Sequence, residues 1–204
     1  MKFEELNERL QFVLTESGKE GYSDFQQQII SLAKNGKNYL FKTHLDEELI
    51  QTIYFLSFFK APEMLEGSPR VLWITSTPEK ARTYVEGFKK MIKRADVTIE
   101  LADNKGKIIE QRNAIFEGTE VLVGNPKRLL DLYNQNGFHV GQITLFIIDH
   151  LSEICKDPLS IQAIRRINES LPKCQKILFT DSEHPKITTF STEICNFYEE
   201  VELS

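Results

Sequence analysis

Asp149 and His150 stand directly after the most apolar run of the sequence, Leu145-Phe146-Ile147-Ile148. A carboxylate at the end of a buried central strand is a common Mg²⁺ position in nucleotide hydrolases, although a single aspartate there is as often a helix cap. Histidine is the residue type that titrates near physiological pH, which makes His150 a candidate base, but the sequence shows no partner for it. This junction predicts either metal-assisted phosphate chemistry or an ordinary helix start.

A second junction, Lys42 to Ile50, would be the place for a phosphate-binding loop. Such a loop needs glycines whose N–H groups close around the phosphates, a lysine for the terminal phosphates and a hydroxyl for Mg²⁺. The stretch has no glycine, and three acids, Asp46, Glu47 and Glu48, stand at the expected helix start. They suit an N-cap and the positive end of a helix dipole, but a carboxylate about 4 Å from a phosphate charge costs about 4 kcal/mol. We therefore predict a capped helix that repels a triphosphate.

The junction after Val71–Thr75 carries two hydroxyls and a proline, Ser76-Thr77-Pro78, followed by Glu79. Hydroxyls and N–H groups at a helix start suit phosphate oxygens, although an ordinary capped helix with proline in its first turn explains the same residues. The expected helix Glu79–Arg94 has six basic side chains against two acidic ones, an excess of four positive charges. Such a run is either a solvated polar face or a stripe that follows a phosphate backbone.

The junction after Glu120–Val123 combines a glycine, a proline and two basic residues. Gly124 permits a tight turn, Pro126 starts a helix, and Lys127 and Arg128 lie near its positive end. Basic side chains next to free N–H groups suit the phosphates of a nucleic-acid backbone.

These junctions recur because short β-branched runs alternate with helical segments along the chain. The better runs are apolar on both sides, which is typical of strands buried between two helix layers. The alternation predicts a three-layer α/β domain, with a mostly parallel sheet of about seven strands and helices on both faces. Ligands of such folds bind at the carboxyl ends of the strands. The expected strands are Asn38–Phe41, Val71–Thr75, Val97–Leu101, Glu120–Val123, Thr144–Ile148, Lys176–Phe179 and, more weakly, Phe197–Glu202.

The composition fits a single soluble domain that spans residues 1–204, with 41% hydrophobic and 27% charged residues. No apolar run approaches the roughly 20 residues that span a bilayer, and the N-terminus lacks the apolar stretch of a signal peptide. We expect a cytoplasmic protein with no membrane partner. The net charge of −5 disfavours a general nucleic-acid binder. The cysteines, Cys155, Cys174 and Cys195, are too far apart for a metal pair and odd in number, so neither a metal site nor a disulfide framework is expected.

Taken in order, the junctions resemble the motifs of the DEAD-box RNA helicases over nearly the whole chain. The family's phosphate loop falls on Thr43–Ile50, where its glycines are replaced by Asp46 and Glu48, its Lys by Leu49 and its Thr by Ile50. Its D-E-A-D motif falls on Asp149-His150-Leu151-Ser152. Only the first Asp, the Mg²⁺ partner, is kept, and the Glu that orients the attacking water is His150.

The remaining family motifs follow in the same order. P-T-R-E-L-A falls on Ser76–Ala81, with the RNA-contacting Arg at Pro78, and S-A-T falls on Thr180-Asp181-Ser182. T-P-G-R-L falls on Asn125–Leu129, which retains the Pro, Arg and Leu. Gln26 lies ten residues before Gly36, the family spacing for its adenine-reading Gln. The resemblance thus implies a Q-motif-like segment over residues 1–36 and a RecA-like core over residues 37–204.

The resemblance implies the first of the family's two RecA-like domains, without its phosphate cradle and catalytic Glu. We therefore expect no catalytic residue, no ATP hydrolysis and no resident cofactor, with ATP and Mg²⁺ held only weakly through Gln26 and Asp149. One function that remains is the binding of RNA or single-stranded nucleic acid. The other is a scaffold or regulatory domain that docks on another protein, and an ATPase completed by a partner chain is a weaker third. The expected nucleic-acid contacts are Thr77, Glu79, Pro126, Lys127 and Arg128.

Overall fold

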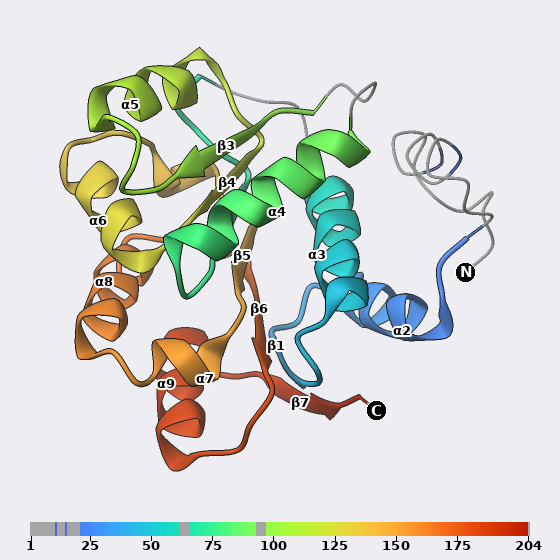
Figure 1. Ribbon diagram of the computed structural model, residues 1–204. Coiled ribbons are helices and arrows are strands. Elements are labelled where there is room, and N and C mark those ends of the chain that lie inside the picture. Colours follow the sequence, from blue (N-terminus) through green and yellow to red (C-terminus); the bar gives the residue numbers. More distant parts are fainter. Residues whose placement is uncertain (1–10, 12–14, 16–20, 62–65, 93–96, 204) are drawn as a thin grey trace.

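Seven parallel strands form one sheet in the order β3-β4-β2-β5-β6-β1-β7, with helices on both of its faces (Figure 1). The structure is a computed structural model that describes residues 21–61, 66–92 and 97–203, together with residues 11 and 15. All six strand pairings are parallel. The strands are β1 (Tyr39–Lys42), β2 (Val71–Ile74), β3 (Ile99–Ala102), β4 (Val121–Gly124), β5 (Leu145–Ile148), β6 (Gln175–Thr180) and β7 (Glu199–Glu202).

The helices divide into two layers. Residues of α2, α3 and α4 pack into one apolar core, and residues of α6 to α9 pack into a second core on the opposite face of the sheet. The helices are α2 (Asp24–Ala33), α3 (Glu47–Lys60), α4 (Pro78–Met91), α5 (Ile108–Glu117), α6 (Pro126–Asn134), α7 (Leu151–Ile154), α8 (Pro158–Asn168) and α9 (Pro185–Cys195), with a short 3₁₀ turn at Val140–Gln142.

The central strands show why both layers exist. Successive strand side chains point to opposite faces, so Trp73 joins the α2–α4 core while its neighbours Leu72 and Ile74 join the other core. Every residue of β2 and β5 is buried. A strand with two apolar faces is stable only between two helix layers, and the three-layer α/β prediction is confirmed.

The predicted strands all exist, with ends shifted by one or two residues. The expected strand Phe197–Glu202 begins at Glu199, because Asn196 has a φ of 59° and turns the chain just before it. The expected helix Glu79–Arg94 begins one residue earlier, at Pro78, with Thr77 as its N-cap. Its predicted end, Arg94, lies outside the described residues.

Several helix starts are fixed by a capping residue or by a proline in the first turn, and the starts of α3, α4, α6 and α9 follow the carboxyl ends of strands. Asp46 caps α3, as predicted, and Pro78, Pro126, Pro158 and Pro185 occupy the first turns of their helices. The three cysteines are free thiols. Among the described residues, none of the helices has the length and apolar character that crossing a bilayer requires.

Candidate functional site

The carboxyl ends of the strands form one edge of the sheet, where the predicted site residues were expected. Strand β2 pairs with both β4 and β5, so Thr75, Asn125 and Asp149 follow three adjacent strands. Strands β6 and β1 continue the same edge, with Lys42 opposite Thr180. Five junctions that are far apart in the sequence therefore lie along one edge.

Asp149 lies at the centre of this edge, and both of its carboxylate oxygens have partners. The indole Nε1 of Trp73 donates a 2.7 Å hydrogen bond to Oδ2, and Nδ1 of His150 lies 2.9 Å from Oδ1. His150 has a φ of 47°, in the left-handed region that is uncommon for a residue other than glycine. The side chain of Asp149 has no exposed surface. His150 thus has the partner that the sequence could not show.

An aromatic cluster encloses this pair. Tyr84 stacks on Trp73, with ring centroids 5.0 Å apart and ring planes 11° from parallel. Tyr54 packs edge-on against Trp73 at 5.8 Å. Burial of the phenol raises the pKa of Tyr84 above its ordinary value. The buried carboxylate is therefore covered on the α3–α4 side of the sheet by large rings.

The junction after β1 is occupied by charges of the chain itself. Lys42 forms ion pairs with Glu183 and Glu200, whose hydrogen bonds raise the pKa of the lysine above its ordinary value. Oδ1 of Asp46 accepts a 2.9 Å hydrogen bond from the N–H of Leu49 and so caps α3. The first turn of α3 thus carries acids, and Lys42, at the end of β1, is already paired.

Gln26, the predicted adenine reader, takes part in a capping box at the start of α2. Its Oε1 accepts from the N–H of Ser23, and its own N–H donates to Oγ of Ser23, both at 3.2 Å. Gln26 is buried, and α2 packs beside α3. The amide oxygen of Gln26 therefore already has a structural partner.

At the start of α4, Thr77 and Glu79 have different surroundings. Oγ1 of Thr77 accepts from the N–H of Lys80 at 3.3 Å, while Glu79 is exposed. Glu153, which the sequence did not single out, accepts from Nζ of Lys80 and from Oγ of Ser76, both at 2.6 Å. Burial alone would raise the pKa of Glu153, but these two hydrogen bonds outweigh it and hold the pKa below its ordinary value. The basic charge of this helix start is thus partly neutralised.

Arg128 is tied to the loop between β3 and α5. Its Nε donates to Oε1 of Gln111 at 2.8 Å, and its Nη2 donates to the carbonyl of Gly106 at 2.6 Å. The same loop contains Asp103, which forms an ion pair with Arg82. Gln111 and Asp103 are partners that only the tertiary fold reveals, because no sequence pattern links them to Arg128 and Arg82.

The start of α6 presents unused hydrogen-bond donors. The N–H of Leu129 closes the first helical bond, to the carbonyl of Asn125, and no side chain caps the helix. The N–H groups of Lys127 and Arg128 precede that bond, where a helix leaves donors free. Nζ of Lys127 lies 3.6 Å from Oδ2 of Asp157. Pro126 lacks an N–H, so the helix start offers two backbone donors to an anion.

A hydrogen bond links the two junctions at the β5–β6 end of this edge. Oγ of Ser152 donates to Oδ1 of Asp181 at 2.6 Å, which connects the start of α7 to the turn after β6. Over the described ranges, no three or more His, Cys, Asp or Glu side chains lie close enough together to hold a metal ion.

This all-parallel sheet, with its polar strand-to-helix junctions, defines a RecA-like α/β domain. The sequence profile of DEAD/DEAH box helicases matches residues 50–183, and the chain belongs to that family. ATP-dependent RNA helicase DBP5 of Lodderomyces elongisporus is 26% identical over 133 residues, which cover 65% of this chain and 24% of that protein. The chain therefore matches about a quarter of that relative's length.

Solved structures agree on the fold. A DEAD box protein from Methanococcus jannaschii superposes with a TM-score of 0.86 at 18% identity, covering 99% of this chain and 56% of that one. Dbp5 of S. cerevisiae bound to RNA and ADP BeF3 gives a TM-score of 0.81 at 18% identity, covering 100% of this chain and 52% of that one. The chain thus spans about half the length of these helicases.

Proposed function

We propose that this chain is a cytoplasmic DEAD-box domain that does not hydrolyse ATP and that binds RNA, or another single-stranded nucleic acid, through its backbone. The burial of Asp149 supports the first part. A Mg²⁺ ion takes oxygen ligands that remain accessible to water and phosphate, whereas the oxygens of Asp149 are enclosed and bound to Trp73 and His150. The carboxylate therefore does not fit a metal-bound triphosphate.

The start of α3 supports the same conclusion. In this family the charge of the phosphates is offset by a lysine and by Mg²⁺, but Lys42 is paired with two glutamates, and Asp46 and Glu47 stand at the helix start. One carboxylate about 4 Å from a phosphate charge weakens binding roughly a thousandfold. Isothermal titration with ATP and Mg²⁺ should give no dissociation constant tighter than about 1 mM, and a micromolar constant would refute the proposal.

The start of α6 supports binding to a nucleic-acid backbone. Two N–H groups, at Lys127 and Arg128, lie at the positive end of a helix dipole with no side-chain cap. Oδ1 of the neighbouring Asn125 is buried and has no hydrogen-bond partner among the described residues. A backbone phosphate suits such donors without any readout of base sequence.

Fluorescence anisotropy with labelled single-stranded RNA across a salt series tests this binding. We expect an affinity that falls as salt rises. Lys127→Ala removes an exposed charge beside these donors and should weaken binding about five- to tenfold, with a dependence on salt concentration that is smaller by about one phosphate contact. Arg166→Ala is the matched control, because Arg166 pairs on the surface of α8 with Glu169. No affinity tighter than about 100 µM at low salt would exclude the RNA proposal.

The internal ion pairs favour protein docking as a second candidate function. Glu153, Asp103 and Asp157 pair with Lys80, Arg82 and Lys127 respectively, which are basic residues at the predicted nucleic-acid face. Solved complexes of S. cerevisiae Dbp5 contain RNA in one case and the proteins Gle1 and Nup159 in another. A domain whose basic side chains are already paired is suited to a protein partner. Absence of RNA binding in the salt series would therefore favour docking.

A further inference from the structure

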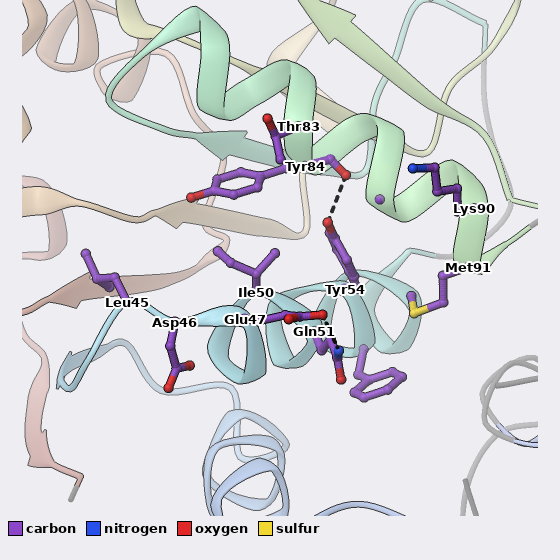
Figure 2. A pocket seen from close by; sticks show the side chains of 12 residues that line it. Leu45, Asp46, Glu47, Ile50, Gln51, Tyr54, Thr83, Tyr84, Lys90 and Met91 are labelled. Carbon is purple, nitrogen blue, oxygen red and sulfur yellow. Dashed lines mark hydrogen bonds between the residues drawn. The ribbon is translucent and has the colours of Figure 1, made fainter. Parts of the chain in front are cut away.

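An apolar groove lies between α3 and α4, beside the aromatic cluster that covers Asp149 (Figure 2). Its volume is about 710 Å³, within the range of clefts that bind ligands or partner side chains. The lining is mainly apolar, and its polar side chains are those of Asp46, Glu47, Gln51, Thr83 and Lys90. The side chains that form the apolar part are Leu45, Ile50, Tyr54, Phe55, Tyr84 and Met91.

The walls of the groove are held rigidly. The hydroxyl of Tyr54, on α3, donates a 2.9 Å hydrogen bond to the carbonyl of Tyr84, on α4. A Cβ atom at Gly87 would lie only 2.6 Å from that hydroxyl, so glycine is needed where the two helices meet. Beyond this point Phe58 and Phe88 stack with centroids 5.0 Å apart. The groove therefore presents a preformed surface rather than one that must open.

The two ends of the groove carry opposite charges. Asp46 and Glu47 lie at the first turn of α3, whereas Lys90 lies at the far end, next to Met91 in the last turn of α4 (Figure 2). All three charged residues are exposed. In the described part of the chain, neither Glu47 nor Lys90 forms an ion pair. These charges are available to a partner, and their separation gives the groove a direction.

We propose that the groove binds an amphipathic helix of a partner protein. This proposal rests on protein docking, the second candidate function, and assigns a site to it. The apolar stripe of that helix packs on Ile50, Tyr54 and Met91. Its acidic N-terminal turn faces Lys90, and its basic C-terminal turn faces Asp46 and Glu47. This direction agrees with the dipole of the incoming helix, which favours acids at its start and bases at its end. A small ligand would need convergent polar groups, whereas here Asp46 and Lys90 lie at opposite ends (Figure 2).

Two synthetic peptides of about 11 residues, or three helical turns, test the direction. Both carry the same leucine stripe at helical spacing. One has Glu in its first turn and Lys in its last turn, and the other has these charges exchanged. Fluorescence anisotropy with wild type and with the double variant Glu47→Lys/Lys90→Glu gives the ratio of the two affinities on each protein. Comparing that ratio between proteins cancels any difference in peptide helicity.

We expect the double variant to shift the ratio about tenfold toward the exchanged peptide, since each attraction between an exposed charge and the first peptide becomes a repulsion. Lys89→Glu, on the same helix but outside the groove, should leave the ratio unchanged. Thr83→Trp, which places a ring in the groove from its exposed lip, should abolish binding of both peptides.

Three outcomes overturn the proposal. The first is that neither peptide binds more tightly than about 1 mM. The second is that the ratio of the two peptide affinities is the same for the wild type and the double variant. The third is self-association in sedimentation that the double variant removes, which would assign the groove to a second copy of this chain. RNA anisotropy on the same variants keeps the nucleic-acid proposal separate. Failure of the nucleic-acid proposal would show as no RNA binding by the wild-type protein. Loss of RNA binding in Glu47→Lys/Lys90→Glu, with binding kept in Lys89→Glu, would assign the groove to nucleic acid.

Discussion

The indole of Trp73 and the carboxylate of Asp149 are joined by a 2.7 Å hydrogen bond across two neighbouring strands, β2 and β5. Both side chains are fully buried. A hydrogen bond to a charged group is stronger than one between neutral groups, and an unpaired buried carboxylate is costly. The carboxylate of Asp149 therefore has a structural role within the core.

Trp73→Phe should lower the free energy of unfolding by about 2–4 kcal/mol, since it leaves a buried oxygen of Asp149 without a donor and opens a small void. Asp149→Asn, which keeps an acceptor oxygen, should cost less. The double variant should lose less free energy of unfolding than the two single variants lose together. Urea unfolding followed by far-UV circular dichroism measures all three, because Trp73 is the single tryptophan and fluorescence is lost with it. Additive losses would contradict coupling between the two side chains.

The fold was largely predictable from the sequence because its signals are local. Val71–Ile74 and Leu145–Ile148 are apolar on both faces, and Pro78 and Pro126 mark helix starts in the residues themselves. The observed strand ends differ from the predicted ones by one or two residues, because hydrogen bonding to a neighbouring strand decides where each strand ends. At Asn38, for example, the N–H of Lys176 in β6 bonds to the side-chain Oδ1 and not to the backbone, and β1 begins one residue later.

The partners of Arg128 and Lys80 were not predictable, because they come from distant parts of the chain. Gln111 is 17 residues from Arg128, and Glu153 is 73 residues from Lys80. Nothing in the residue types distinguishes these acids and amides from other surface polar residues. The left-handed conformation of His150 was also not predicted, since few residues other than glycine adopt it.

Gly124→Ala should destabilise the domain by about 1–3 kcal/mol. A Cβ at this position would lie 2.7 Å from both the Cβ and the backbone oxygen of Ala102, and the backbone of a neighbouring strand cannot move aside. Gly141→Ala is the control, because its added Cβ meets no atom within 4 Å. Thermal unfolding of the two variants provides the comparison. Equal midpoints would show that β3 and β4 can move apart enough to accommodate the added Cβ.

Asp103 should make the domain sensitive to acid. Burial alone would raise the pKa of its carboxyl, but hydrogen bonds from the N–H of Gly106 and from Arg82 outweigh burial and hold the pKa below its ordinary value. The unfolded chain then binds the proton more readily, so the stabilisation is complete above the unfolded pKa of about 4 and is lost as the pH falls through the lower folded value. Unfolding free energies from about pH 5 downward should fall less steeply in Asp103→Asn and Arg82→Gln. If the free energy of unfolding fell with pH as steeply in both variants as in the wild type, this assignment would be contradicted.

Removing the acid beside Lys127 should strengthen RNA binding if the start of α6 contacts the backbone. Asp157 lies 3.6 Å from the amine of Lys127 and also caps α8 by accepting from the N–H of Leu159. Asp157→Asn keeps an oxygen for the cap and removes the charge, so the fold should be retained while Lys127 is released. We expect the dissociation constant for single-stranded RNA at low salt to fall about two- to fivefold, as one exposed ion pair is worth up to about 1 kcal/mol, with a steeper salt slope. Glu169→Gln, which breaks a comparable exposed pair on α8, controls for the change in net charge. An equal gain in both variants would show that RNA responds to overall charge and not to this helix start.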